Sequence, residues 1–386
     1  MGRNTILYYG NILYPDLDAA SHRTIGNAKA LRELGYNVVL VGIREGEKRT
    51  ILETKEIFEG FEIYYFADPR SLEQWKNYLF GYNPLKEVLA MLKDVGSVIL
   101  YNHPSISTKK ICSFCHKKGI KVYADCTEWF DPKGFSAHNT IKRLDTWYRM
   151  KHVNKHLDGI ITISSFLQNY YKKYGCKTMC VPPLIDLTQE KWAKSETIAS
   201  LTENGKHLIY VGNPGAGTKD KLTWIIKALK QVKVKRSDLH FNLDIVGMTE
   251  EQFNNVFKMS LAGYDFVRFH GRKPNIEALN FIKRSDYTIF LRENNLICTA
   301  GFPTKFSESL ACGTPVLTNI SSDLGKYLKD GVNGYEMNIT SNEALTSSLE
   351  KALSLGREEL KRMKEYCAKD NTFDYHSFVD EFAKMF

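Results

Sequence analysis

The chain has 386 residues, of which 43% are hydrophobic and 25% are charged. This composition excludes a disordered protein and a mini-protein, and the length predicts two domains of about 150–200 residues each. No run of about 18 apolar residues could span a membrane, and Gly10 and Asn11 interrupt the first apolar run before a signal-peptide core could form. The sequence therefore predicts a cytoplasmic protein without a membrane span.

The eight cysteines are scattered too sparsely for a disulfide framework. Cys112, Cys115 and His116 spell the C-x-x-C-H string of covalent haem attachment, which normally requires an exported protein. A helix carrying two thiols is the favoured interpretation. The only other close pair, Cys176 and Cys180, does not complete a zinc pattern, so no metal site is predicted.

The formal net charge of +9 is unevenly distributed. Residues 109–177 contain 14 Lys and Arg against 5 Asp and Glu. Within this stretch, Trp147 and Tyr148 are mixed with five cations, which favours a helix that faces an anionic surface, either a membrane leaflet or a phosphate-bearing substrate. A solvated helix face is the alternative, and nucleic acid is not an expected partner because no recognised nucleic-acid module accompanies the charge. The five cations are Lys142, Arg143, Arg149, Lys151 and Lys155.

Short apolar runs alternate with amphipathic stretches along the first half of the chain. This rhythm indicates βαβ units with a parallel sheet that is buried on both faces, and functional loops are expected at the carboxyl ends of its strands. The expected strands cover residues 4–10, 37–42, 97–102, 121–125, 158–164 and 177–183, and the expected helices cover 20–36, 107–120 and 165–175.

A second βα series follows a polar stretch and the turn at Pro182-Pro183. Its strands are expected at 207–212, 240–247, 287–291 and 315–319, and its helices at 222–232, 277–285 and 306–313. Ligands of such paired domains usually bind where the strand ends converge in the cleft between them. The predicted division is a Rossmann-like domain over 1–187, a linker over 188–205, a second Rossmann-like domain over 206–365, and a C-terminal helix over 366–386 that packs back on the first domain.

Glycines follow the first strand of the second series, at Gly212, Gly215 and Gly217. Backbone N–H groups beside them, together with the start of the next helix, could bind a phosphate. Thr218 precedes Lys219, which reverses the order of a P-loop and disfavours an NTPase. A tight structural turn with a solvated lysine is the alternative.

A second loop, with the sequence GFPT, precedes a short helix in which Glu308 occupies the first turn. Carboxylates favour this position for electrostatic reasons alone. Alternatively, Glu308 offers two acceptor oxygens to the vicinal diol of a ribose.

The segment PTKFSESLACGTPVLTN resembles the nucleotide-binding signature of GT-B glycosyltransferases, specifically the family-4-type enzymes that build capsular and other surface polysaccharides. The resemblance extends over most of the chain, through KVYADCTEWF, DGIITISSFL, VPPLID, YVGNPGAGTKD, VRFHGRKP and DGVNGYEMN in that order. It implies an α/β GT-B fold, in which two Rossmann-like domains face each other across a cleft. It also implies transfer of a sugar from a nucleoside diphosphate sugar to a glycan acceptor.

By position, the resemblance implies that Glu308 binds the ribose hydroxyls and that Lys219 neutralises the diphosphate, with Thr304 and Lys305 beside the phosphates. A second glutamate of the family pattern is replaced by Ala300, which leaves the donor sugar open. Many members carry an arginine near the position that Asn213 occupies in this chain. Lys221 or Arg272 could supply that positive charge instead. The other candidates for nucleotide-sugar binding are Gly212, Gly217, Gly301, Phe302 and Pro303.

Acceptor contacts are expected in the first domain. Gly10 and Asn11 lie in a predicted loop after the first strand, and His103 follows another strand. Asp125 and Glu128 could hydrogen-bond the acceptor, or one could be the general base of an inverting displacement. A capped structural turn is the alternative for Asp125.

The prediction is a glycosyltransferase that retains anomeric configuration and needs neither metal nor cofactor, because lysines and helix N-termini stabilise the leaving diphosphate. The leaving phosphate itself would take the acceptor proton. The acceptor is expected to be a glycan or lipid-linked glycan at the inner face of the membrane. The alternatives are a sugar-nucleotide epimerase or phosphorylase of the same fold, or a catalytically silent subunit that binds nucleotide-sugars.

Overall fold

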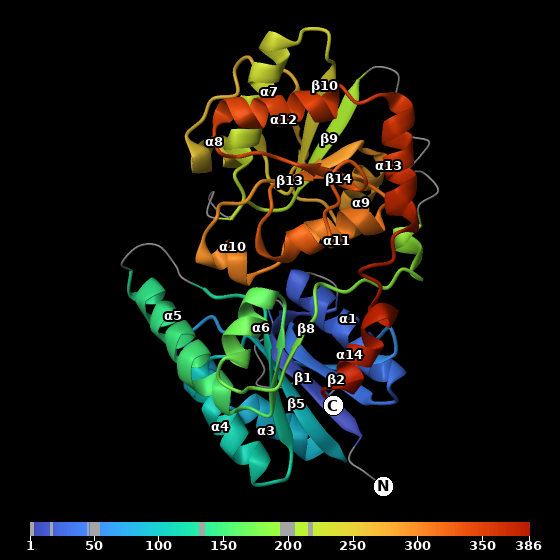
Figure 1. Ribbon diagram of the computed structural model, residues 1–386. Coiled ribbons are helices and arrows are strands. Elements are labelled where there is room, and N and C mark those ends of the chain that lie inside the picture. The colour runs from blue at the N-terminus through green and yellow to red at the C-terminus, as the bar shows by residue number, and fades with distance from the viewer. Residues whose placement is uncertain are drawn as a thin grey trace. The chain divides into compact units, whose positions relative to one another are not determined.

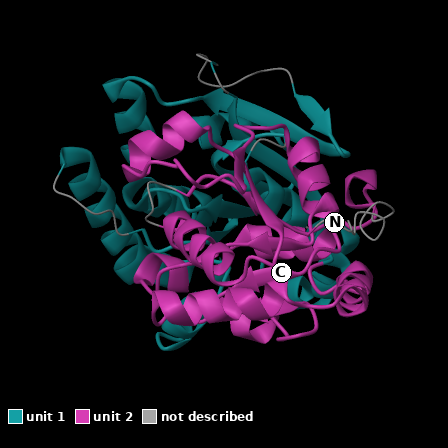
Figure 2. Cartoon of the chain, turned by 90° about the horizontal axis from the view of Figure 1, so that it is seen from above, with its two compact units in different colours: residues 1–184, 300–302, 374–386 teal, residues 185–299, 303–373 magenta. Residues whose placement is uncertain are grey.

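Figure 1 shows the computed structural model of the protein, which describes residues 4–15, 18–44, 46, 55–130, 136–193, 205–214 and 219–386. The chain forms two compact units, which Figure 2 distinguishes by colour. Unit 1 consists of Met1–Leu184, Ala300–Phe302 and Asp374–Phe386, and unit 2 consists of Ile185–Thr299 and Pro303–Phe373.

Unit 1 is built on an eight-stranded sheet with the order β3-β4-β2-β1-β5-β6-β7-β8. All neighbouring strands are parallel except β3, which pairs antiparallel with β4. The strands are β1 (Thr5–Leu13), β2 (Asn37–Arg44), β3 (Glu56–Phe58), β4 (Phe61–Ala67), β5 (Val95–Tyr101), β6 (Lys121–Cys126), β7 (Gly159–Thr162) and β8 (Thr178–Cys180). The helices are α1 (Ala19–Glu33), α2 (Leu72–Phe80), α3 (Asn83–Met91), α4 (Ser105–His116), α5 (Ala137–Tyr148), the π-helix η1 (Arg149–Val153), the 3-10 helix η2 (Asn154–His156) and α6 (Ser165–Lys172).

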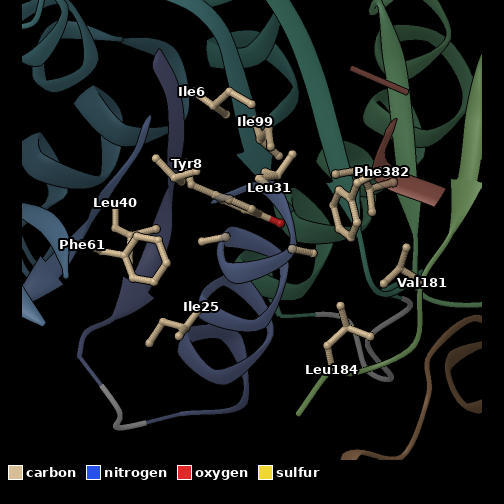
Figure 3. Packing of buried hydrophobic residues seen from close by; sticks show 14 of the residues in the cluster. Ile6, Tyr8, Ile25, Leu31, Leu40, Phe61, Ile99, Val181, Leu184 and Phe382 are labelled. Atoms are coloured by element: carbon tan, nitrogen blue, oxygen red, sulfur yellow. The ribbon is translucent and has the colours of Figure 1, made fainter. Parts of the chain in front are cut away.

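The central strand β1 explains why the apolar runs of this sheet do not alternate with polar residues. Ile6 and Tyr8 belong to one buried hydrophobic cluster, whereas Leu7 and Tyr9 belong to another. Successive side chains of a strand point to opposite faces, so both faces of this sheet are buried. Figure 3 shows the first of these clusters, in which Tyr8 lies near Leu31 of α1.

The C-terminal segment contributes to the same cluster of unit 1. It forms the 3-10 helix η6 (Tyr375–Phe378) and α14 (Val379–Ala383), and Phe382 is fully buried (Figure 3). Lys177 Nζ, just before β8, donates a hydrogen bond of 2.8 Å to the carbonyl oxygen of Met385. The chain returns to unit 1 between Phe373 and Asp374, later than the expected boundary at residue 365, because the long helix that precedes it continues in unit 2 to Lys369.

Unit 2 contains a six-stranded parallel sheet with the order β11-β10-β9-β12-β13-β14. Its strands are β9 (Lys206–Val211), β10 (Phe241–Val246), β11 (Val267–Phe269), β12 (Tyr287–Ile289), β13 (Val316–Thr318) and β14 (Gly334–Glu336). The helices in this part of the chain are η3 (Glu190–Trp192), α7 (Leu222–Lys235), α8 (Glu250–Phe257), α9 (Asn275–Arg284), α10 (Leu296–Ala300), α11 (Thr304–Ala311), η5 (Ser322–Lys326), α12 (Asn342–Leu353) and α13 (Arg357–Lys369).

The predicted α/β class with two parallel-sheet units is confirmed. Within the described ranges, no helix is both long and apolar enough to cross a bilayer. One predicted loop is wrong: Gly10 and Asn11 lie inside β1, which continues to Leu13 through a shift in its register with β2. A side chain at Gly10 would approach Tyr101 Cβ of β5 to 2.9 Å, so close packing between β1 and β5 requires this glycine.

Candidate functional site

A buried ionic cluster lies just beyond the strand ends of β9 and β12 in unit 2. Asp220 lies two residues before the start of α7 and forms a β-bridge with Arg292, three residues past β12. Its side chain is ion-paired with Lys305 Nζ of α11 and with Arg292 Nε, the latter at 3.3 Å. Its carboxylate also accepts a hydrogen bond of 2.7 Å from the hydroxyl of Tyr210, in β9. Three segments that are distant in sequence thus meet at one carboxylate.

The charges in this cluster do not cancel, because one carboxylate serves two cations. Burial alone would raise the pKa of Asp220, but Lys305 and Arg292 lower it by more, so the carboxyl group remains ionised. Burial lowers the pKa of Lys305, whereas the ion pair with Asp220 opposes this shift. The cluster therefore retains one excess positive charge at the carboxyl ends of parallel strands, where α/β proteins bind their ligands.

Lys305 is held in place by its surroundings as well as by its charge. Its ammonium group lies 4.2 Å from the ring centroid of Tyr210, a cation–π contact. Gly212, with φ +124°, brings the end of β9 against this lysine, and a Cβ atom there would lie 3.4 Å from Lys305 Nζ. The left-handed conformation and the close approach both favour glycine at position 212.

Two further predicted donor-site residues lie on the same helix as Lys305. Glu308 is half-buried, and its negative charge raises the pKa of Lys305, which places the two charged groups within electrostatic reach. Thr304 is half-buried at the first position of α11, after Pro303 as N-cap. Helix α11 begins at Thr304, earlier than predicted, so Glu308 lies in its second turn and not in its first as expected.

The glycine-rich segment is described only in part, since Gly217 lies outside the described residues. Lys219 is exposed and adjacent to Asp220, and its carbonyl oxygen lies 3.7 Å from Cys298 Sγ. Asn213 is exposed directly after Gly212. Asn213 and Lys219 therefore lie close in sequence to Asp220, the carboxylate at the centre of the ionic cluster.

The two cations that could replace the missing family arginine have different surroundings. Lys221 is ion-paired with Glu293 at 3.0 Å. Arg272 is exposed beyond β11, at the edge of the sheet. Arg292, which the sequence analysis did not single out, is the cation that joins Lys305 at Asp220, and its place directly after a predicted strand was the available signal.

The loop before α11 is divided between the two units. Ala300, Gly301 and Phe302 cluster with unit 1, whereas Pro303 belongs to unit 2. Ser164 Oγ donates a hydrogen bond of 2.7 Å to the carbonyl oxygen of Ala300, and the side chain of Ala300 is buried. Its methyl group cannot accept the hydrogen bonds that a glutamate would at this position.

In unit 1, Asp125 at the end of β6 is fully buried and held by several donors. Arg23 Nη2 and Nε donate to its carboxylate at 2.8 and 3.0 Å, and the hydroxyl of Tyr8 also donates to it. Burial lowers the pKa of Arg23, but Asp125 raises it by more, so the guanidinium stays charged. These contacts favour a structural role for Asp125 over that of a general base, because both oxygens already accept hydrogen bonds.

The remaining acceptor-side candidates lie near the same strand ends. His103 is buried, and its Nε2 lies 2.8 Å from Ser107 Oγ. Burial and the nearby Arg149 lower the pKa of His103 to about 3, so its ring is neutral at physiological pH. Glu128 is half-buried two residues after β6, and Asn11 has a buried side-chain oxygen without a hydrogen-bond partner. Within the described part of the chain, no group of three His, Cys, Asp or Glu side chains could hold a metal ion.

Comparison with known proteins identifies the class. Residues 194–370 match the family model of glycosyl transferases group 1. No curated protein matches the chain. The match covers unit 2 almost completely and confirms the predicted resemblance to GT-B glycosyltransferases, so the protein is an enzyme of the glycosyltransferase class.

Solved structures show the same fold over both units. Sucrose-phosphate synthase from Thermosynechococcus elongatus superposes with a TM-score of 0.72 at 12% identity, covering 99% of this chain and 97% of that one. HepE from Anabaena, in complex with UDP and glucose, gives 0.65 at 14% identity with 98% of each chain covered. WaaG, a glycosyltransferase involved in lipopolysaccharide biosynthesis, gives 0.63 at 14% identity, covering 98% of this chain and 99% of that one. At these identities the likeness establishes the GT-B fold.

Proposed function

We propose that the protein transfers a sugar from a nucleoside diphosphate sugar to a glycan acceptor. The observation that carries this proposal is the excess positive charge of the Asp220–Lys305–Arg292 cluster, at the carboxyl ends of the sheet that matches the family model. A diphosphate is the group whose negative charge such a cluster would balance. The UDP and glucose bound by HepE agree with this class of donor.

Within unit 2 we assign the donor contacts to α11 and the segment after β9. Glu308 would accept hydrogen bonds from the ribose hydroxyls, and Lys219 and Thr304 would contact the diphosphate together with Asn213 and the backbone at Gly212. Lys305, being buried against Asp220, would act mainly through its charge. Gly301, Phe302 and Pro303 would shape the loop before α11, and Arg272 remains a candidate cation for the diphosphate.

Retention of configuration without a metal is the mechanism we favour. Because Asp125 is held by Arg23, it does not offer the free carboxylate that an inverting general base needs. The leaving phosphate would then accept the acceptor proton while Lys219 and the cluster stabilise its growing charge. Glu128 is assigned to acceptor binding.

The acceptor is proposed to be a glycan of a surface polysaccharide, carried on a lipid at the cytoplasmic face of a membrane. Helix α5 supports this because Ile141, Leu144 and Trp147 leave 54%, 61% and 47% of their surfaces exposed. Lys142 beside them is exposed as well, which gives the helix the apolar and basic faces of an interfacial helix. Arg149 was predicted to belong to this surface but is buried, with 6% of its surface exposed.

The test is incubation with a panel of nucleotide-sugars, with and without extracted lipid-linked glycans, while nucleoside diphosphate release is followed. Release that requires the acceptor supports the transferase. Interconversion of the nucleotide-sugars without release would indicate an epimerase, and phosphate-dependent release of a sugar phosphate from the glycan would indicate a phosphorylase. Binding without any turnover would indicate the silent subunit, to which Ala300 points.

A further inference from the structure

Arg149, the first residue of the π-helix η1, is a buried cation without a carboxylate partner among the described residues. Only 6% of its surface is exposed. Its Nη1 donates to the carbonyl oxygen of Asn102, directly after β5, and its buried Nε has no hydrogen-bond partner. Asp145, one turn earlier, instead accepts hydrogen bonds from the backbone N–H and hydroxyl of Ser105 at 2.8 and 2.7 Å.

Arg23 in the same unit shows how a buried arginine is normally stabilised. With 2% of its surface exposed, it is ion-paired with Asp125 at 2.8 Å and also donates to the carbonyl oxygen of Val181 at 2.9 Å. A buried charge without such a partner costs several kcal/mol, so buried cations are usually paired. Arg149 thus has the surroundings of an arginine that pairs with an anion, and none of the described residues supplies that anion.

A small cavity lies beside Arg149, at the carboxyl ends of β5 and β6. Its volume is about 10 Å³, and its lining includes Asn102, His103 and Arg149. His103 Nδ1 is buried without a hydrogen-bond partner, so a second polar atom at this place is unsatisfied. Asp125 also lines the cavity, but its charge is balanced by Arg23. The volume suits a single atom of the size of a water, such as one terminal oxygen of a phosphate.

We propose that Arg149 is the anion receptor of unit 1 and binds a phosphate group of the acceptor. A planar guanidinium with unused N–H donors is the side chain best suited to phosphate oxygens. Its place beside the carboxyl ends of β5 and β6, on a π-helical turn of the kind often found at functional sites, agrees with a ligand-binding role. The assignment to the acceptor rests on the proposed function, whereas phosphate binding itself does not.

The first experiment measures the melting temperature as a function of inorganic phosphate, with sodium chloride of equal ionic strength as the reference. Phosphate is expected to raise the melting temperature of the parent protein and of Lys121→Gln, an exposed lysine at the opposite end of β6. Arg149→Gln should lose most of this response. Lys219→Gln, which removes a proposed diphosphate contact of unit 2, measures how much of the response comes from the donor site. An unchanged response in Arg149→Gln, or its loss only in Lys219→Gln, would refute the proposal.

If Arg149→Gln does not fold, Arg149→Lys takes its place. This variant keeps the charge but not the planar donors, so it should need at least tenfold more phosphate for the same response. An unchanged phosphate dependence in Arg149→Lys contradicts the proposal.

Kinetics then distinguish the two possible sources of the phosphate. With an acceptor that carries a phosphate group, the Arg149 variant should raise the acceptor KM at least tenfold and leave the donor KM unchanged. A rise in the donor KM alone would assign Arg149 to the donor diphosphate and refute the acceptor assignment. Failure of glycosyl transfer with an intact phosphate response would count against the proposed function and not against the anion site.

Discussion

Lys305 and Asp220, 85 residues apart in the chain, form an ion pair that is almost completely buried at the carboxyl end of the unit 2 sheet. The pair joins helix α11 to the segment between β9 and α7, and Arg292 contributes a second cation from the segment after β12. A site for a charged donor can thus be built on rigid strand ends, with its cations oriented before any ligand binds.

Asp220→Asn should destabilise unit 2 by about 3–5 kcal/mol, because it leaves Lys305 and Arg292 buried without their counter-charge. The measurement is urea unfolding at neutral pH. Asp265→Asn is the matched control, since Asp265 forms an exposed ion pair with Lys233 at 2.7 Å, and little change is expected there. Equal stability of the two variants would show that Asp220 does not anchor the cluster.

Glu308→Ala should weaken binding of a nucleoside diphosphate at least tenfold while folding is preserved. Each lost hydrogen bond from a ribose hydroxyl to the carboxylate is worth about 1.5–3 kcal/mol. Titration calorimetry with the parent, Glu308→Ala and the exposed control Glu343→Ala measures the effect. A dissociation constant that is the same in all three proteins would remove Glu308 from the donor site.

His103 should make unit 1 acid-sensitive. Its pKa is about 3 in the folded protein against 6.5 as the reference, so the unfolded chain takes up a proton first as the pH falls below 6.5. Stability is therefore lost progressively between pH 6.5 and pH 3. Between pH 7 and pH 5, the parent should lose about 2 kcal/mol more than His103→Gln, which has no titrating ring. Parallel stability curves for the two proteins would contradict the buried neutral imidazole.

Helix α5 should bind anionic vesicles through apolar and basic side chains together. Ile141→Ser with Leu144→Ser should reduce co-sedimentation at every salt concentration, whereas Lys142→Gln should reduce it mainly at low salt, by about 1 kcal/mol per charge. Leu72→Ser on α2, where the leucine is 84% exposed, is the control for a lost surface leucine. If the α5 substitutions leave vesicle binding unchanged, or if the protein shows no preference for anionic lipid, α5 is a solvated helix and not a membrane-binding one.

Much of the fold was predictable because its strands are continuous apolar runs with helices between them. The first expected strand, 4–10, lies within β1 except for residue 4, and the expected strand 207–212 coincides with most of β9. Strand β4 was missed although its sequence, FEIYYFA, is rich in aromatic residues, because no helix precedes it in a βα rhythm. It follows the short antiparallel β3 instead.

The candidate site was predictable only where a residue lies inside a recognisable motif. Thr304, Lys305 and Glu308 share one short helix, so their proximity follows from sequence. Asp220 and Arg292 meet through a β-bridge between two loops, and Arg23 reaches Asp125 from 102 residues away. Such contacts depend on the tertiary packing and leave no periodic signal in the chain.

Transfer of a labelled sugar from a nucleotide-sugar to an extracted lipid-linked glycan, measured in a single turnover, tests the proposed glycosyltransferase activity. One nucleoside diphosphate should be released per sugar incorporated. The rate should be about 10²–10³ lower in Lys219→Ala, because charge grows on the diphosphate as the bond breaks, while the α7 surface variant Lys227→Ala should remain at the parent rate. Nucleotide-sugar that stays bound and intact beside a competent acceptor, or equal rates in the parent and Lys219→Ala, would contradict this proposal.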